Sequence, residues 1–118
     1  MKTPHKRLIA WQKSMDLVEL TYKLTARFPT SEEYGLVSQM RRAAVAAPSI
    51  IAEGAANNSV PQVKRYLSIA IGTLSDWDTQ LELAYRVKYI DLKALVECQA
   101  LVNSCLAVSY GLRRSLGK

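Results

Sequence analysis

The 118-residue sequence has few of the residues from which catalytic and metal sites are built. It contains one histidine, His5, and two cysteines, Cys98 and Cys105. A metal site needs several such ligands close together, and these three residues are too few and too scattered to form one. The serines and cysteines have no recognisable base partner, and no glycine-rich phosphate loop or Glu-x-x-His pair is present. We therefore expect no metal, no cofactor and no enzymatic activity.

The two cysteines are also not placed for a disulfide. They lie seven positions apart in a segment with helical periodicity, which sets their Cα atoms about 10 Å apart, beyond the roughly 7 Å limit for a disulfide. We expect both to be small core residues. No apolar run approaches the ~18 residues of a membrane span, and no signal-type apolar core follows the basic start. These absences predict a cytoplasmic protein with no membrane segment.

Helical periodicity is abundant, and it divides the chain into four segments. The first ends before Pro29, because the residue preceding a proline is pushed out of the helical region. The second is predicted from about residue 33 to 56, after capping side chains at 30–33, and the fourth from about 92 to 116, after Asp91 as its cap. The predicted core stripe of the first helix is Leu8, Trp11, Met15, Val18 and Tyr22, with Leu17, Leu24 and Phe28 broadening the face. That of the third helix is Val63, Leu67, Ala70, Leu74, Trp77, Leu81 and Ala84.

No strand-like alternation, internal repeat or low-complexity tract interrupts these segments. Four helices with short connections predict an all-α fold, an antiparallel up-and-down four-helix bundle. We expect a single domain over residues 1–118, in which residues 1–6 form a basic, mobile tail.

The second and third helices each have a second face of small or polar residues opposite the core. On the second helix this face comprises Gln39, Arg42, Ala46, Ser49 and Glu53. On the third it includes Asp76 and Gly72, and a glycine inside a helix costs about 1 kcal/mol relative to alanine. Pro48 removes one intrahelical hydrogen bond, which predicts a kink in the second helix. Such faces indicate either an exposed surface of short side chains or close packing on another chain; we interpret them, with Pro48, as the motif of a homo-oligomer interface.

One end of the predicted bundle is strongly basic. The chain has 16 Lys and Arg residues against 10 Asp and Glu, a formal net charge of +6. Up-and-down topology brings together the start of the first helix, the connection between the second and third, and the end of the fourth. Nine cations and one carboxylate, Glu53, fall at this end, which leaves about +8. The nine are Lys2, Lys6, Arg7, Lys13, Lys64, Arg65, Arg113, Arg114 and Lys118.

Two interpretations of this basic pole are open. It consists of solvated tails that aid solubility, or it is a surface that binds phosphates. In the second case the candidate contacts are Lys6, Arg7, Lys64, Arg65, Arg113 and Arg114. No helix-turn-helix, zinc-finger or aromatic sheet motif is present, so binding to RNA or DNA would be electrostatic and without sequence preference.

Several short motifs, in order over residues 8–90, resemble a known bacterial family. They include Phe28-Pro29, Glu33-Tyr34-Gly35-Leu36, Arg41-Arg42-Ala43-Ala44, Ile51-Ala52-Glu53-Gly54, Arg65-Tyr66-Leu67 and Gly72-Thr73-Leu74. Their order is similar to that of the four-helix-bundle family named after proteins encoded in 23S rRNA intervening sequences. Ala46 and Ile50 stand where that family has a serine and an asparagine.

The resemblance implies a bundle that assembles, in known members, into a pentameric ring. It also implies kinship with the accessory proteins of diversity-generating retroelements, which are basic pentameric barrels that bind nucleic acid and a reverse transcriptase. We therefore expect a homo-pentamer that binds RNA or DNA at its basic pole. The alternative is an oligomeric scaffold that recruits another protein and has no nucleic-acid role.

Overall fold

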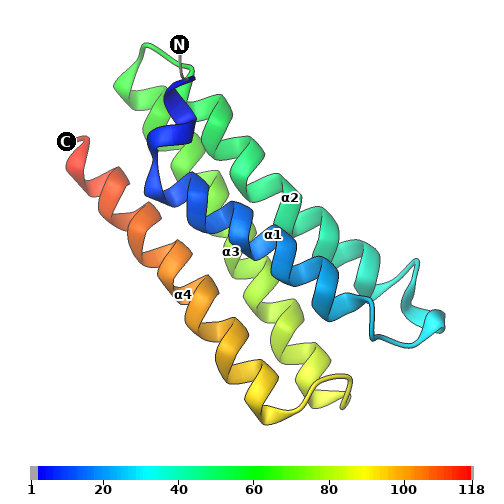
Figure 1. Cartoon of the computed structure of the whole chain (residues 1–118). Coiled ribbons are helices and arrows are strands. Elements are labelled where there is room, and N and C mark those ends of the chain that lie inside the picture. Colours follow the sequence, from blue (N-terminus) through cyan, green and yellow to red (C-terminus); the bar gives the residue numbers. More distant parts are fainter. Residues whose placement is uncertain (1–2, 118) are drawn as a thin grey trace.

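The computed structural model of the protein describes residues 3–117. It consists of four α-helices packed antiparallel (Figure 1). The helices are α1 (Ile9–Thr25), α2 (Leu36–Ala55), α3 (Val60–Arg86) and α4 (Leu92–Ser115). Two short 3-10 helices, η1 (Pro4–Arg7) and η2 (Thr30–Glu32), precede α1 and α2. No strand occurs among the described residues. The predicted all-α antiparallel bundle is confirmed.

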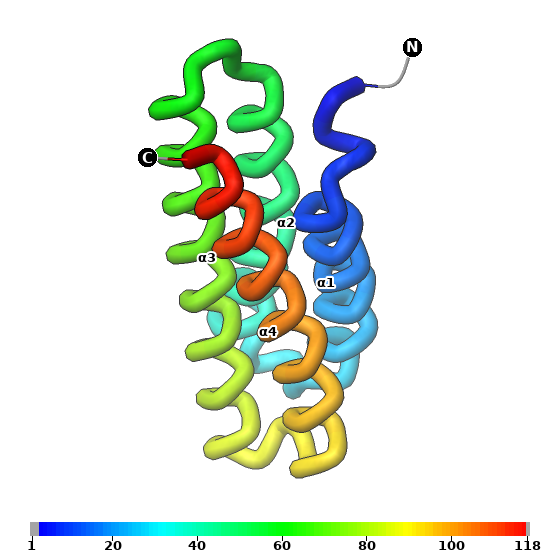
Figure 2. The backbone as a smooth tube through the Cα atoms, turned by 90° about the vertical axis from the view of Figure 1, so that its left-hand side faces the viewer, coloured from blue at the N-terminus to red at the C-terminus, as the bar shows by residue number. Residues whose placement is uncertain are grey.

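Each helix packs against its neighbour in the chain, and α4 closes the bundle by returning beside α1 (Figure 2). The result is an elongated body of 44 × 23 × 22 Å. The start of the chain, the α2–α3 connection and the end of α4 all lie at one end (Figures 1 and 2). This arrangement brings the segments of the predicted basic pole together.

The core is formed most clearly by α3, whose predicted stripe is buried from Leu67 to Ala84, with Trp77 completely enclosed. The two cysteines are free and buried in α4, as predicted. On α2, Met40, Ala44 and Ala47 are fully buried. The small side chains of Ala44 and Ala47 let α2 and α3 pack extensively along their lengths.

The predicted core stripe of α1 is wrong in part, because the helix is turned about its axis. Met15 and Tyr22 are 39% and 45% exposed. The buried residues of α1 are Ala10, Ser14, Leu17, Thr21 and Thr25, of which the predicted face included Leu17 alone. The two threonine hydroxyls donate to the carbonyl oxygens of Leu17 and Thr21, at 2.6 and 2.7 Å. Because these hydroxyls are satisfied within their own helix, α1 can bury a face that looks polar in the sequence.

The start of α2 also differs from the prediction, since the helix begins at Leu36 rather than near residue 33. Glu32 lies in η2 and caps α2 from there: its Oε1 accepts from the backbone N–H of Leu36 at 3.0 Å. Its Oε2 accepts from the hydroxyl of Tyr89, at 2.7 Å, in the α3–α4 connection. The predicted cap of α4, Asp91, is confirmed, and Ser59 caps α3.

Pro48 lies inside α2, which continues through it as one helix. The kink expected there stays a prediction. Pro48 itself is buried within the protomer. Its outward neighbour Ser49 is exposed and bonds the carbonyl oxygen of Val45 at 2.9 Å.

Residues 4–6, which were expected to belong to a mobile tail, form η1 together with Arg7, and η1 packs against α1 and α2. The side chain of Gln12 donates to the carbonyl oxygen of Lys6 at 2.9 Å. The rings of His5 and Trp11 lie 5.1 Å apart. Residues 1 and 2, which also belong to the predicted tail, lie outside the described residues.

By length and composition α4 is apolar enough to cross a membrane, although the sequence was expected to contain no such segment. The reason is that residues 98–112 carry no charge. The helix nevertheless packs against α1 and α3 and buries Cys98, Val102 and Cys105 in the core. It is a partly buried core helix of a compact bundle rather than a clear membrane span.

Candidate nucleic-acid interface

Three cations of the basic pole meet between the first turns of α3 and the last turn of α4. Lys64, Arg113 and Arg114 line one open pocket, together with Tyr110 and Gly117. The Nζ of Lys64 donates to the carbonyl oxygen of Gly117 at 2.6 Å. These contacts place positive charge at the C-terminal end of α4, where the helix dipole favours it. The same position leaves the group open to an anion from solvent.

Arg113 is held by two contacts. Its Nη1 donates to the hydroxyl of Ser68 on α3 at 3.0 Å, and its guanidinium lies 5.0 Å from the centre of the Tyr110 ring. Neither contact neutralises the charge. A positioned, charged guanidinium is well suited to a phosphate, which it can bind with paired donors.

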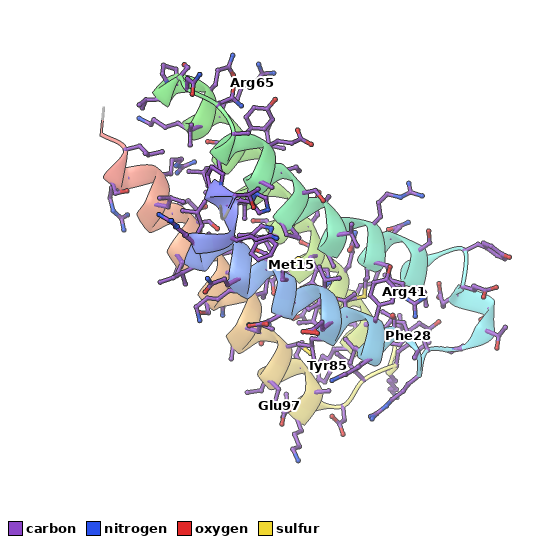
Figure 3. All side chains as sticks on the ribbon, turned by 45° about the horizontal axis from the view of Figure 1, so that its top comes forward. Met15, Phe28, Arg41, Arg65, Tyr85 and Glu97 are labelled. Atoms are coloured by element: carbon purple, nitrogen blue, oxygen red, sulfur yellow. The ribbon has the colours of Figure 1, made fainter. Side chains whose placement is uncertain are left out.

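The other three predicted contacts lie apart from this group. Arg65 points outward from α3 at the same end of the molecule (Figure 3). Lys6 is exposed on η1, and Arg7 lines a separate apolar groove with Val108 and Leu112. The structure therefore joins Lys64, Arg113 and Arg114 and leaves Lys6, Arg7 and Arg65 around them. Lys2 and Lys118 lie outside the described residues.

Carboxylates are concentrated away from this pole. Glu53 is exposed near the end of α2, while Glu32, Glu82, Asp91 and Glu97 lie toward the opposite end, where Figure 3 shows Glu97. Among residues 3–117 one salt bridge is formed, between Arg86 and Glu82 at 3.2 Å, and it also lies toward the opposite end. The cations of the pole thus remain without a carboxylate partner among the described residues.

The predicted oligomer interface is exposed on the protomer. A shallow groove of about 230 Å³ runs between α2 and α3, lined by Gln39, Arg42, Ala43, Ala46, Thr73, Asp76 and Gln80. Ser49, Glu53 and Gly72 are exposed beside it. No atom lies within 4 Å of the position that a Cβ on Gly72 would take, so packing within the protomer does not require glycine there. Pro48 differs from the rest of the set, because it is buried against α1.

Comparison with known proteins identifies the family of this chain. A family model described as 23S rRNA-intervening sequence protein matches residues 6–111. The chain belongs to this family. Its members are small helical bundles that are generally non-catalytic. Among curated proteins, none matches the chain at a significant level.

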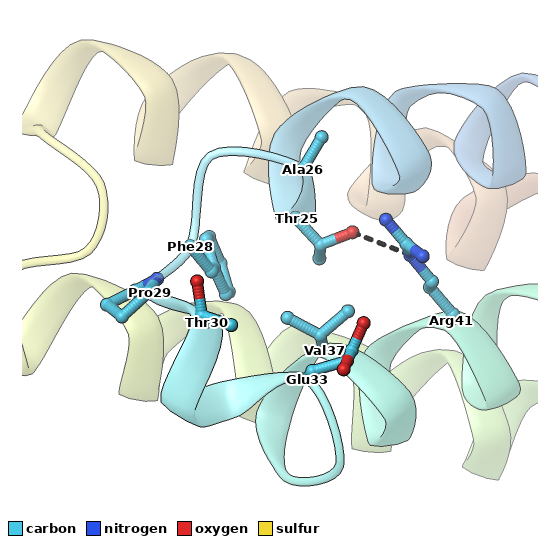
Figure 4. Close-up of a pocket in the computed structure, with 8 residues that line it drawn as sticks. All are labelled: Thr25, Ala26, Phe28, Pro29, Thr30, Glu33, Val37 and Arg41. Atoms are coloured by element: carbon cyan, nitrogen blue, oxygen red, sulfur yellow. Dashed lines mark hydrogen bonds between the residues drawn. The ribbon is translucent and has the colours of Figure 1, made fainter.

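One arginine of the pair shared with the 23S rRNA-intervening sequence family is structural, which the sequence did not reveal. The Nε of Arg41 donates to the hydroxyl of Thr25 at 2.9 Å (Figure 4). Its guanidinium lies 4.5 Å from the centre of the Tyr22 ring. It thereby ties α2 to the end of α1. Only Arg42 faces outward. The pair therefore divides between a helix–helix contact and the outer face of α2.

Other family motifs line a small pocket at the α1–α2 turn. It has a volume of about 180 Å³ and is lined by Phe28, Pro29, Thr30, Glu33, Val37 and Arg41, with Thr25 and Ala26 (Figure 4). Phe28 packs against Tyr89, with ring centres 5.3 Å apart. These motif residues fix the turn. No group of three or more His, Cys, Asp or Glu side chains in the described part of the chain is placed to hold a metal ion.

Proposed function

We propose that this member of the 23S rRNA-intervening sequence family is a non-enzymatic homo-pentamer that binds RNA or DNA through its basic pole, without sequence preference, in the cytoplasm. The observation that carries the proposal is the group formed by Lys64, Arg113 and Arg114. It stands at one end of the bundle and has no carboxylate partner among the described residues. Lys6, Arg7 and Arg65 widen this surface. Such a surface suits a phosphate backbone, since it offers several cations and no means of reading bases.

Assembly is supported by the exposed α2–α3 face and by the unexplained glycine at position 72. Gln39, Arg42, Ser49, Glu53 and Asp76 are the side chains that we assign to this face. In a pentamer whose poles point the same way, five copies of the cationic group share one rim. Electrostatic attraction to nucleic acid then increases with the number of copies.

The test compares two charge reversals of equal size. Lys64→Glu with Arg65→Glu removes charge from the pole, and glutamate is tolerated in the first turns of α3 because it suits the helix dipole there. Lys23→Glu with Lys93→Glu makes the same change at the opposite end, where both lysines are exposed. Binding of a labelled single-stranded RNA is measured by fluorescence anisotropy across a range of salt, and the assembled mass by light scattering.

We expect the wild type to have about five times the 13.2 kDa mass of one chain. Its affinity should fall steeply with salt, and the pole variant should reduce the logarithmic slope by about 1.4 per protomer, at ~0.7 for each lost contact to a single strand. The control should keep the slope. Equal slopes in both variants would show that the pole is not the binding surface. If the protein is oligomeric but does not bind RNA at low salt, the result would favour the alternative function, a scaffold that recruits another protein.

A further inference from the structure

The groove between α1 and α2 is an apolar surface that the protomer leaves uncovered. It has a volume of about 350 Å³ and is lined by Trp11, Met15, Val18, Val45, Pro48, Ser49 and Ala52. Met15, which Figure 3 marks on α1, is 39% exposed, and Val45 on α2 is 42% exposed. This surface exists because α1 turns Thr21 and Thr25 inward instead of Met15 and Tyr22. A hollow with apolar walls and exposed apolar rims is suited to receive a large side chain.

The outer face of α4 is a second uncovered surface. Only 28% of the most apolar stretch of this helix is buried. Ala107 and Tyr110 are exposed on it, and the Tyr110 ring projects with 42% of its surface accessible. At Gly111 an added Cβ would meet no atom within 4 Å. The face therefore consists of one projecting aromatic ring, with the Arg113 guanidinium 5.0 Å from its centre, beside the short side chains of Ala107 and Gly111 that let another surface come close.

The two surfaces lie on different sides of the protomer, since one is formed by α1 and α2 and the other by α4 beside α3 (Figure 2). A single copy cannot bring them together. Two copies can, with the Tyr110 ring of one in the α1–α2 groove of the other. Such a contact joins unlike faces and leaves a free groove and a free ring for further copies.

Charges fix the direction in which the copies align. Gly54 on α2 packs against Tyr66 on α3, and Arg113 on α4 bonds Ser68 on α3. Glu53 and Arg114, the exposed neighbours of Gly54 and Arg113, therefore lie in one layer near the basic pole. When two copies stand parallel, Arg114 of one is level with Glu53 of the other, and the pair attracts. An antiparallel arrangement would separate them by most of the length of the bundle.

Gly72 fits the same arrangement. It lies four residues, slightly more than one helical turn, from Ser68, and Ser49 lies the same distance from Glu53, in both cases away from the pole. In parallel copies the α3 of one molecule, next to its α4, then passes over the α2 of the other at the level of these two small residues. A side chain at position 72 would hold the helices apart, which accounts for a glycine that the protomer does not need.

We propose that the protein assembles head to tail in parallel, with Tyr110 and Ala107 of one copy seated on the α1–α2 groove of the next and Arg114 beside Glu53. This inference rests on the proposed homo-oligomer and specifies its interface. It assigns Met15, Val45 and Tyr110 to that interface, none of which the sequence singled out for assembly.

The test uses two variants that each disable one of the two faces. Val45→Asp places a charge at the rim of the groove, and Ala107→Asp places one beside Tyr110. Both positions are exposed in the protomer, so the fold should persist and circular dichroism can verify it. Val60→Asp is the matched control, because Val60 is 45% exposed and lies outside both surfaces, at the start of α3. Masses are measured by light scattering for each protein alone and for an equimolar mixture of the two variants.

Each face variant alone should have the 13.2 kDa mass of a single chain. Their mixture should form a species of twice that mass, because the intact α4 face of Val45→Asp meets the intact groove of Ala107→Asp. The control should keep the wild-type mass. An oligomeric wild type whose mass neither variant changes, or a mixture that stays monomeric, would overturn this interface. A monomeric wild type would instead overturn the homo-oligomer itself.

A charge exchange gives an independent measurement. Glu53→Arg alone and Arg114→Glu alone should each raise the concentration at which half of the chains assemble by about fivefold, the upper range for one exposed pair. Both changes in one chain should restore assembly, since the pair reforms between copies with its signs exchanged. Failure of the double variant to recover would refute the parallel alignment.

Discussion

Two helical glycines should respond in opposite directions to the same substitution. An alanine Cβ at Gly72 would meet no atom within 4 Å. At Gly54 it would lie 2.8 Å from the Cβ of Tyr66 and 3.8 Å from the carbonyl oxygen of Val63. The first contact is with an atom fixed to the α3 backbone, so it cannot be relieved by a rotamer change. Gly54→Ala must therefore push α2 and α3 apart, whereas Gly72→Ala disturbs nothing in the protomer.

The two effects can be given magnitudes. Alanine is about 1 kcal/mol more favourable than glycine inside a helix, so Gly72→Ala should stabilise the protomer by about that amount. For a domain of this size that corresponds to roughly 4 °C in Tm. Overpacking typically costs about 1–3 kcal/mol. After the gain in helix propensity, Gly54→Ala should be destabilising by about 0–2 kcal/mol, which leaves the two variants about 1–3 kcal/mol apart.

Urea unfolding followed by circular dichroism measures this difference. The protein should be diluted until the unfolding midpoint no longer depends on its concentration, so that the protomer alone is observed. Gly111→Ala is the matched control, because it too is a helical glycine with no atom within 4 Å of the added Cβ. Gly54→Ala and Gly72→Ala of equal stability would refute the packing argument. If a neighbouring chain comes close to position 72, the stability gain of Gly72→Ala over the wild type should become smaller at concentrations that favour assembly.

Two further predictions concern titratable groups. The Leu36 N–H and then the Tyr89 hydroxyl lower the pKa of Glu32, so this carboxylate stabilises the fold above its unfolded pKa and loses that contribution as pH falls through the folded pKa. Glu32→Gln should therefore flatten the decline in urea midpoint between about pH 6 and pH 3. An unchanged pH profile would contradict the stabilising role of the Glu32 hydrogen bonds to Leu36 and Tyr89. Burial raises the pKa of Cys98 and of Cys105 to about 11. Both should react with iodoacetamide at about pH 8 much more slowly in the native protein than in urea, and equal rates would show that the thiols are accessible.

The elements that the sequence alone predicted best are those whose apolar residues define a single buried face. In α3, the stripe through Leu74, Trp77 and Leu81 has a single continuous apolar side, so the fold class and the core of this helix followed from it. Asp91 was recognisable as a cap because its partner, the N–H of Ala94, is three residues away. Such signals are local and survive without knowledge of the tertiary structure.

The parts that could not be predicted depend on distant partners. On α1, apolar and hydroxyl residues compete for the core, and the outcome is decided by how closely α2 and α4 approach. Glu32 caps α2 and also accepts from the hydroxyl of Tyr89, 57 residues later, a contact that no local pattern predicts. Likewise the helical spacing placed Arg42 on the outer face of α2, but it could not show that Arg41 contacts Thr25 and Tyr22. The site was therefore predictable as a set of charges at one end, but not as the particular group of Lys64, Arg113 and Arg114.

The direction of assembly links the two proposals. A parallel head-to-tail contact turns every basic pole to the same side, so Lys64, Arg65 and Arg113 of all copies add along one rim, while Arg114 is used in the contact with Glu53. A symmetric contact in which the same face meets itself with the helices antiparallel would place the poles at opposite ends and separate their charges. Nucleic acid would then meet only one group at a time. The two-chain species formed by the mixed variants should accordingly bind RNA with a steeper salt dependence than either variant alone, because one strand can then contact two adjacent poles.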